Sequence, residues 1–241
     1  MKHRQGALIF DLAFTLTEPW TVLFGPSGSG KTTVLRTIAG FVRPATGRIF
    51  LQARSDTAER ILLDTSTRTF VPAHRRKVRF AAQTPALFPN LTVRENISYG
   101  ASSDQNAIHV TTMVTDALER FRITTLATKR PMQLSGGERQ RVAVARAAVS
   151  AVAAGDESLL LLDEPFAGLD LRLRDELLLD LREWLAASGT PVLSVTHDVG
   201  EAFQLGAEVI KIAEGRVIEQ GPVRTVLAME RERLMEQLRE N

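Results

Sequence analysis

Residues 20–40, WTVLFGPSGSGKTTVLRTIAG, constrain the fold of this chain more than any other stretch. The apolar run 20–24 has the length of a buried strand, and a glycine-rich loop follows it. Residues 31–39 then predict a helix that Gly40 ends. The loop matches the pattern G-x-x-x-x-G-K-[ST], which belongs between a strand and a helix. The stretch therefore predicts an α/β domain with a phosphate-binding loop.

The residue types in this loop explain the chemistry that it predicts. Glycines at 25, 28 and 30 permit a tight backbone whose N–H groups point inward at phosphate oxygens. The helix N-terminus adds a partial positive charge. Lys31 can reach the β and γ phosphates, and the Thr32 hydroxyl can bind Mg²⁺. The alternative is a glycine-rich turn with a surface lysine. The loop predicts these ATP-binding residues: Gly25, Pro26, Ser27, Gly28, Ser29, Gly30, Lys31, Thr32 and Thr33.

Short β-rich runs alternate with helical patterns along the rest of the chain. Residues 84–134 have helical spacing and few strand signals, which predicts an inserted, mostly helical segment. Residues 171–187 predict an amphipathic helix, and 229–241 a charged helix or tail with a solvated face. This order favours a mostly parallel sheet with helices on both faces. The remaining predicted strands are 47–51, 77–82, 158–163, 191–196, 208–213 and 216–220.

The composition is that of a soluble globular protein, with 44% hydrophobic and 24% charged residues among 241. A net charge of +2 does not by itself indicate nucleic acid, and an arginine-rich surface is the alternative interpretation. The absence of cysteine excludes disulfides and thiol chemistry. We predict no signal peptide. Apolar runs such as 159–162 are far shorter than the roughly 20 residues that span a bilayer, so any membrane role needs a partner.

Two carboxylates follow the four-leucine run at 159–162. Asp163 ends the predicted strand, at the sheet edge where nucleotides bind in open α/β folds, and can ligate Mg²⁺. Glu164 points to a different side and is free to orient or deprotonate a water. Two adjacent acids can also begin a helix, but the preceding leucines and Pro165 argue against that.

Two other predicted strands end in polar side chains that belong to the same edge. His197 follows the strand 191–196, and Gln83 follows 77–82. A lone histidine is more often structural than catalytic, and a lone amide is weak evidence. At a sheet edge with a phosphate loop, however, His197 can contact a γ phosphate, and Gln83 can contact Mg²⁺ or the attacking water.

A second anion site is predicted at 134–141, LSGGERQR. Two glycines follow Ser135, and a run rich in helix formers follows them. The free N–H groups of such a helix N-terminus favour an anion.

Together these motifs resemble the nucleotide-binding subunits of ABC transporters, and the likeness covers nearly the whole chain. The signature LSGGE separates this family from other P-loop proteins. The matching segments, in the family's order, are Walker A at 25–33, the Q-loop at Gln83, the signature at 134–138, Walker B at 159–164, the D-loop at 167–170 and the switch histidine in 195–198.

The resemblance implies roles for these positions. Thr32 and Asp163 would bind magnesium, and Gln83 would contact the metal and sense the nucleotide. Glu164 would be the general base and His197 the γ-phosphate contact, so that Glu164, His197 and Gln83 form the catalytic set.

The resemblance also implies residues that act across an interface between two copies. Asp170 would cross the dimer interface and help to position the opposing site. Ser135, Gly136 and Gly137 would contact the γ phosphate bound to the other copy. Glu138 replaces the usual glutamine of the signature, and we expect it to leave the Ser-Gly-Gly site intact.

The implied fold is a P-loop NTPase of the α/β class. It has a RecA-like core at about 1–84 and 151–230, a small antiparallel β region, and an inserted helical subdomain at about 85–150. We expect a single ABC ATPase domain over 1–241 with no C-terminal regulatory domain. The place of the adenine-stacking aromatic that is usual in the family falls near Lys2 and His3. Three explanations stay open: weak adenine stacking, His3 in place of the aromatic, or a start of the protein further upstream.

The implied function is ATP hydrolysis with Mg²⁺ by a homodimer that drives solute import. The partners would be membrane permease subunits and a solute-binding protein, and no nucleic acid. The chain would then lie on the cytoplasmic face of the plasma membrane, bound through the permease. The segment 70–100, with P-x-x-R-R and LFP-x-x-T-V-R-x-N, is similar to molybdate-type importers.

Two other functions fit parts of the sequence. A soluble ABC-type ATPase acting on nucleic acid or ribosomes usually has two cassettes or a coiled-coil insert, and neither is present. A P-loop kinase would leave LSGGE without a purpose. For permease docking we consider Leu87, Phe88 and Leu91, with ordinary packing in the helical part as the alternative.

Overall fold

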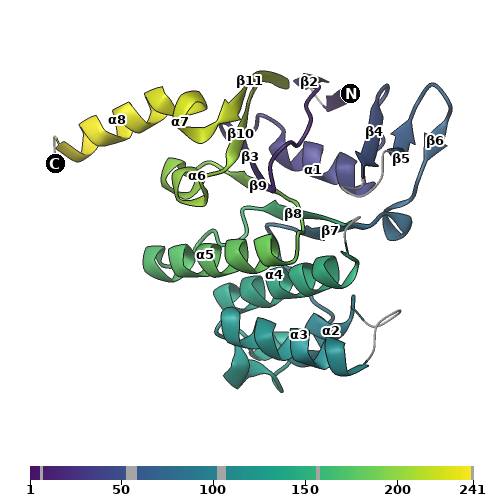
Figure 1. Ribbon diagram of the computed structural model, residues 1–241, viewed down its shortest axis with the longest axis vertical. Coiled ribbons are helices and arrows are strands. Elements are labelled where there is room, and N and C mark those ends of the chain that lie inside the picture. The colour runs from purple at the N-terminus through teal and green to yellow at the C-terminus, as the bar shows by residue number, and fades with distance from the viewer. Residues whose placement is uncertain (6–7, 53–58, 102–106, 156–157, 240–241) are drawn as a thin grey trace.

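The computed structural model describes residues 1–5, 8–52, 59–101, 107–155 and 158–239. Two β-sheets and helix α1 form the upper part in Figure 1, and helices α2, α3 and α4 form the lower part. This arrangement confirms the predicted α/β class.

The central sheet carries the strand that precedes the phosphate loop. Its order is β1-β2-β11-β10-β3-β9-β8-β7. From β10 to β7 all neighbours are parallel, whereas β10 and β11 form an antiparallel hairpin, as do β1 and β2. The strands are β1 (Lys2–Gln5), β2 (Leu8–Asp11), β3 (Trp20–Phe24), β7 (Val78–Ala81), β8 (Leu159–Asp163), β9 (Val192–Thr196), β10 (Glu208–Ala213) and β11 (Arg216–Pro222).

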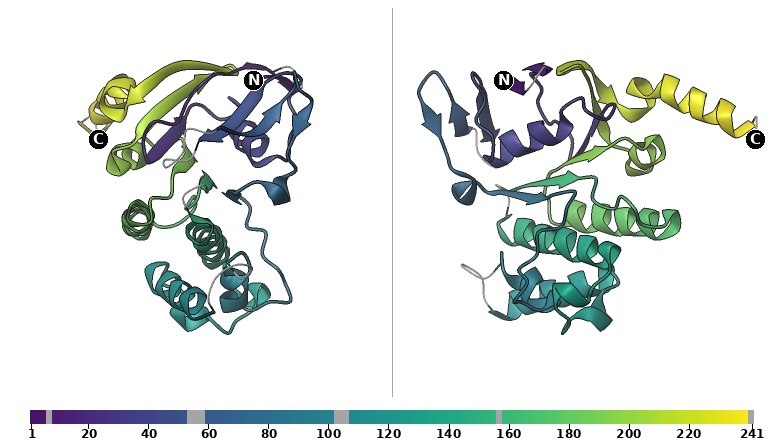
Figure 2. Two further views of the ribbon diagram at one scale, coloured as in Figure 1. Left: turned by 45° about the vertical axis from the view of Figure 1, so that its right-hand side comes forward. Right: turned by 180° about the vertical axis from the view of Figure 1, so that it is seen from behind.

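Helices cover both faces of this sheet (Figures 1 and 2). Side chains alternate between the faces of a strand. Leu159 and Leu161 of β8 therefore pack in the core on the side of α1, whereas Leu160 and Leu162 pack in the larger core that includes α4 and α5. The helices are α1 (Lys31–Ala39), α2 (Val93–Ser98), α3 (Ala107–Arg120), α4 (Gly136–Ala153), α5 (Leu171–Ala187), α6 (Val199–Leu205), α7 (Val223–Val226) and α8 (Ala228–Arg239).

A second, antiparallel sheet lies beside α1 and consists of β4 (Arg48–Gln52), β5 (Glu59–Asp64) and β6 (Thr69–Phe70). The Arg76 guanidinium joins this sheet to α1, although its side chain is almost completely buried. It donates to the Thr37 and Ile38 carbonyls at the end of α1, at 3.0 and 2.6 Å, and to the Leu62 carbonyl in β5 at 3.3 Å. The negative end of the α1 dipole therefore compensates a buried charge.

The lower part begins with a loop that Asn96 organises. The Asn96 amide donates to the Phe88, Leu91 and Thr92 carbonyls at 3.0–3.1 Å, and its oxygen accepts the Phe88 N–H. Leu87 packs against the larger core, and Phe88 packs on Tyr99, with ring centroids 4.2 Å apart. All three candidate docking residues, Leu87, Phe88 and Leu91, are half-buried, and Tyr99 beside Phe88 is 58% exposed.

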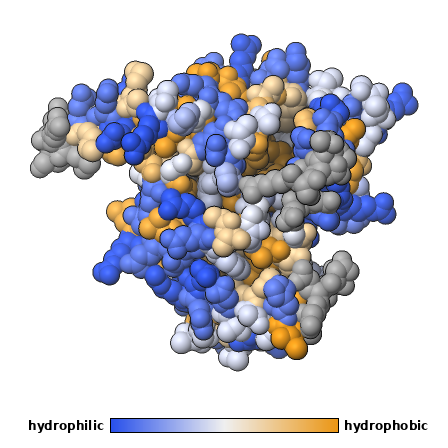
Figure 3. Space-filling model, viewed as in Figure 1, coloured by the Kyte–Doolittle hydropathy of each residue, from blue (hydrophilic) through white to orange (hydrophobic). Residues whose placement is uncertain are grey.

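Helix α8 extends away from the rest of the chain (Figures 1 and 2). It contacts the body at its start, where the Lys211 ammonium lies 2.6 Å from the Glu230 carboxylate. Figure 3 shows its surface as mainly hydrophilic, as predicted for 229–241, of which 240–241 lie outside the described residues. Across the described ranges, no helix combines the length and apolar character needed to cross a membrane.

Candidate nucleotide site

The phosphate loop connects the end of β3 to the start of α1, and its glycines have conformations that other residues disfavour. Gly28 and Gly30 have φ of 80° and 95°. A Cβ at Gly30 would also lie only 2.0 Å from the Phe10 ring. The short loop and the helix start that it forms are the anion-binding arrangement predicted from the sequence.

Lys31 lies in the first turn of α1 and folds back over this loop. Its ammonium donates to the Gly25 and Pro26 carbonyls at 2.7 and 2.9 Å. Burial lowers the pKa of the Lys31 ammonium, and the nearby Glu164 and Asp163 carboxylates oppose that shift. Both of these acceptors are neutral carbonyl oxygens, and an anionic phosphate oxygen is a stronger acceptor for the ammonium.

Asp163 ends β8 beside the start of α1. The Thr32 hydroxyl donates to Asp163 Oδ1 at 3.1 Å. The Asp163 side chain is buried, and this burial raises its pKa; the Glu164 charge adds to the rise and the Thr32 hydrogen bond opposes it. Mg²⁺ is commonly held by one or two protein oxygens together with substrate phosphates and water. Thr32 and Asp163 offer such oxygens, so the residues present fit this ion.

No larger protein cage for a metal is found. In the part of the chain that the structure describes, no group of three or more His, Cys, Asp or Glu side chains could hold a metal ion.

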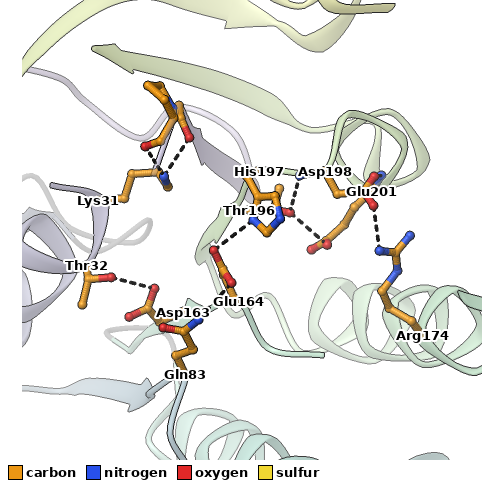
Figure 4. Close-up of polar contacts among 12 residues, drawn as sticks. Lys31, Thr32, Gln83, Asp163, Glu164, Arg174, Thr196, His197, Asp198 and Glu201 are labelled. Atoms are coloured by element: carbon orange, nitrogen blue, oxygen red, sulfur yellow. Dashed lines mark hydrogen bonds and ion pairs between the residues drawn. The ribbon is translucent and has the colours of Figure 1, made fainter. Parts of the chain in front are cut away.

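Glu164 joins three strand ends (Figure 4). Its Oε2 accepts a hydrogen bond from Gln83 Nε2 at 3.1 Å, and its Oε1 lies 3.0 Å from His197 Nδ1. Its backbone N–H donates to the Val195 carbonyl at 3.1 Å. Glu164 has φ of 47°, which is rare for a residue with a side chain and turns its carboxylate away from Asp163. The structure thus brings Gln83, Glu164 and His197 together.

The sequence reasoning did not predict the contacts made by Thr196 and Asp198, which flank His197. Arg174 Nη1 lies 2.7 Å from Asp198 Oδ2, and the Thr196 hydroxyl donates to Glu201 Oε2 at 3.0 Å. Burial raises the Glu201 pKa to about 7. Asp198 and Glu201 have the spacing of a helix-capping pair, which could have predicted the start of α6 but not the burial of Glu201.

Ser135 begins α4 with reciprocal capping bonds. Its hydroxyl accepts the Glu138 N–H at 3.2 Å, and Glu138 Oε2 accepts the Ser135 N–H at 2.7 Å. These bonds lower the pKa of the Glu138 carboxyl. The Glu138 carboxylate therefore lies at the N-terminus of α4, beside the predicted anion site.

The two anion sites lie on different parts of the molecule: α1 belongs to the upper part of Figure 1, and α4 to the lower. Gly137 instead meets the D-loop of its own chain, because a Cβ there would lie 2.6 Å from Leu169 Cδ2. Asp170 caps α5 by accepting the Leu173 N–H at 2.9 Å. The structure thus brings Gly137 close to the segment that ends in Asp170.

A phosphate loop after one parallel strand, with a carboxylate at the end of another, defines a P-loop nucleotide-binding protein. Residues 10–167 match the family model described as ABC transporter. The chain therefore belongs to the ABC transporter family.

Known members of this family are similar over most of the chain. A molybdenum import ATP-binding protein, ModC, from Rhizobium etli is 38% identical over 94% of this chain. A spermidine/putrescine import ATP-binding protein, PotA, from Acidothermus cellulolyticus is 42% identical over 92% of it. The chain spans only 61% and 55% of the lengths of these two relatives.

A dimeric ATP-binding cassette solved in a post-hydrolysis state with ADP and Pi is similar in structure. It has a TM-score of 0.72 and 27% identity, and the match covers 92% of this chain and 95% of the cassette. The likeness confirms the predicted fold, with its mainly parallel sheet, small antiparallel sheet and helical region.

Proposed function

We propose that this chain is the ATP-hydrolysing subunit of an ABC import system. The observation that carries the proposal is the convergence of Thr32, Asp163, Gln83, Glu164 and His197 on one sheet edge beside the phosphate loop. The import function of the relatives supports it at the level of the family. We also propose the division into a core at about 1–84 and 151–230 and a helical subdomain at about 85–150, which the helices α2, α3 and α4 support although α4 extends to Ala153.

The site residues would divide the work of hydrolysis. The loop 25–33 would bind the phosphates, and Thr32, Asp163 and Gln83 would hold the metal. Magnesium, when bound, neutralises charge on the β and γ phosphates. Glu164 would accept the proton of the attacking water, because each of its oxygens keeps a lone pair beside the contact with Gln83 or His197. His197 would contact the γ phosphate when its ring leaves Glu164.

The active species would be a head-to-tail homodimer that encloses two Mg-ATP. Figure 1 supports this, because α1, which follows the phosphate loop, belongs to the upper part of the molecule and α4 to the lower part. Ser135, Gly136 and Gly137 of one copy would face the phosphate loop of the other. The dimeric form of the similar cassette also supports it.

The chain would work at the cytoplasmic face of a membrane, bound to permease subunits that receive solute from a binding protein. For the solute we propose an inorganic oxyanion of the molybdate type. The segment 70–100 and the similarity to ModC support an oxyanion, and the similarity to PotA makes polyamines the competing class.

Steady-state ATPase kinetics of the purified chain test the enzymatic role. We expect Glu164→Gln to lower kcat at least 100-fold and to change the Kd for Mg-ATP less than threefold, because only the proton acceptor is lost. Glu183→Gln is the matched control, since Glu183 is exposed on α5. Unchanged turnover in Glu164→Gln would exclude Glu164 as the base.

Solute uptake tests the rest of the proposal. Deletion of the gene in its own host should abolish uptake of labelled molybdate and leave uptake of labelled spermidine intact. The wild-type gene should restore uptake, and the Glu164→Gln gene should not. Loss of spermidine uptake alone would replace the oxyanion by a polyamine, and uptake of both solutes at the wild-type rate would refute both assignments.

A further inference from the structure

An ion pair joins the start of α5 to the residue that follows His197. Arg174 Nη1 lies 2.7 Å from Asp198 Oδ2, and the Arg174 side chain is only 16% exposed. In helix α5, the Arg174 N–H donates to the Asp170 carbonyl at 2.9 Å. The guanidinium therefore links the D-loop end of α5 to the segment that carries the switch histidine (Figure 4).

Asp198 in turn fixes the backbone on both sides of His197. Its Oδ1 accepts the Glu201 N–H at 3.0 Å and so caps α6. Its own N–H donates to the Thr196 hydroxyl at 3.0 Å, and that hydroxyl donates to Glu201 Oε2. The Thr196 and Glu201 side chains are buried, whereas the Asp198 side chain is 32% exposed. His197 itself projects from this fixed turn to Glu164, with its ring 62% exposed.

The packing of α5 against α6 does not depend on Arg174 alone. Arg182 Nη1 donates to the Gln204 and Leu205 carbonyls at the end of α6, at 3.0 and 3.2 Å. Gln204 Nε2 donates to the Asp175 carbonyl at 3.1 Å. Loss of Arg174 should therefore leave the two helices together while it frees the Asp198 carboxylate.

We propose that Arg174 is a positioning residue for His197: through Asp198 it sets the position of the His197 backbone relative to Asp170 at the start of α5. This inference rests on the proposed ATPase function. If Asp170 crosses the dimer interface as proposed, the ion pair would couple contact with the second copy to the placement of His197. Rates of enzyme reactions are sensitive to misplacement of about 1 Å, so the pair can matter without touching the nucleotide.

Steady-state ATPase kinetics of a small variant set test this proposal. Arg174→Met removes the charge but keeps an unbranched apolar chain, and Arg174→Lys keeps a single cationic donor. Asp198→Asn keeps a side-chain oxygen to cap α6 and removes the negative charge. We expect Arg174→Met and Asp198→Asn each to lower kcat roughly tenfold, with the KM for ATP changed less than twofold. The double variant should be no slower than either single variant, and Arg174→Lys should recover part of the loss.

Two arginines of the same helix provide controls. Arg172 is 89% exposed and pairs with Glu176 within α5, so Arg172→Met should have wild-type kinetics and wild-type Tm. Arg182→Met removes a different link between α5 and α6, and should lower Tm while kcat stays within twofold of wild type. A structural role common to all α5–α6 contacts would instead lower kcat in Arg182→Met as much as in Arg174→Met.

The outcomes separate this inference from the proposed function. An inactive wild-type chain, with its permease present, contradicts the ATPase assignment itself. An active wild type with additive effects in the double variant, or with Arg174→Met at the wild-type kcat, overturns only the positioning role. A higher KM for ATP at an unchanged kcat in Arg174→Met would make Arg174 a determinant of nucleotide binding. That result would also overturn the proposal.

Discussion

Ionisation of the buried Glu201 carboxyl should lower the free energy of unfolding as the pH rises. Substitution of Glu201 by glutamine should remove this pH dependence. The side chain is 6% exposed. Its Oε2 accepts a hydrogen bond from the Thr196 hydroxyl, whereas its Oε1 is buried and has no hydrogen-bond partner among the residues that the structure describes. Burial raises the pKa of this carboxyl from 4.5 to about 7; the Thr196 bond and the Arg174 charge oppose the shift, and the Asp198 and Glu164 charges add to it.

The sign and size follow from linkage. The folded state binds the Glu201 proton more tightly than the unfolded state does, so its stabilising effect is complete below pH 4.5 and is lost as the pH rises to 7. A shift of this size corresponds to about 3 kcal/mol at 1.36 kcal/mol per pKa unit. Glu201→Gln keeps the acceptor for Thr196 and cannot ionise. Its stability should lie within about 1 kcal/mol of wild type at pH 5, and about 2–3 kcal/mol above wild type at pH 8.

Urea denaturation followed by circular dichroism at several pH values from 5 to 8 measures this difference. Because the other titrating groups are common to both proteins, their contributions cancel in the comparison. Glu183→Gln, on the exposed side of α5, should follow the wild-type curve throughout. A free-energy difference between Glu201→Gln and wild type that stays constant from pH 5 to 8 would show that burial does not hold Glu201 in its protonated form.

Three other substitutions test further parts of the structure. Arg76→Met removes the side-chain donors to the Val71, Thr37, Ile38 and Leu62 carbonyls, of which Thr37 keeps the Gly40 N–H and Leu62 keeps the Val71 N–H. It should lower the free energy of unfolding by about 2–5 kcal/mol in urea denaturation, and a loss below about 1 kcal/mol would contradict the structural role of Arg76. Lys31→Ala should weaken Mg-ATP binding more than tenfold in calorimetry at unchanged fold, and wild-type affinity would exclude it as a phosphate contact. Glu138→Gln removes a negative charge from the start of α4. In the Glu164→Gln background it should lower the dissociation constant of the ATP-dependent dimer roughly three- to fivefold, as measured by sedimentation. A higher dissociation constant would mean that the dimer needs the carboxylate.

Local patterns predicted the elements around the nucleotide site well. The strand 20–24, the helix at 31–39 ended by Gly40 and the helix 171–187 have the bounds that the structure gives to β3, α1 and α5. Each has a strong local cause: a buried apolar run, a glycine in the left-handed conformation, or a helical apolar period. The convergence of strand ends followed from the parallel order of the sheet. The roles of the site residues stay predictions.

Contacts between distant residues could not be read from the sequence. Strands β4 and β5 pair with a bulge between Ile49 and Phe50, and the buried guanidinium of Arg76 joins their sheet to α1. The pair Arg174 and Asp198 joins residues 24 positions apart, and nothing local distinguishes this arginine from exposed Arg172. Burial of Glu201 likewise depends on which face of α6 meets β9 and α5. Such features need the tertiary structure because they come from packing between elements rather than from propensity within them.

The central claim is that two copies of this chain close head to tail over ATP, each supplying Ser135 to the other. Sedimentation velocity of the Glu164→Gln variant with and without Mg-ATP tests it most directly, because blocked hydrolysis should let the closed form accumulate. We predict a dimer with Mg-ATP, a monomer without it, and a monomer in both conditions when Ser135→Arg is added, at unchanged Kd for ATP. A Glu164→Gln variant that binds Mg-ATP and stays monomeric at every concentration tested, or a dimer that Ser135→Arg leaves intact, would contradict the account.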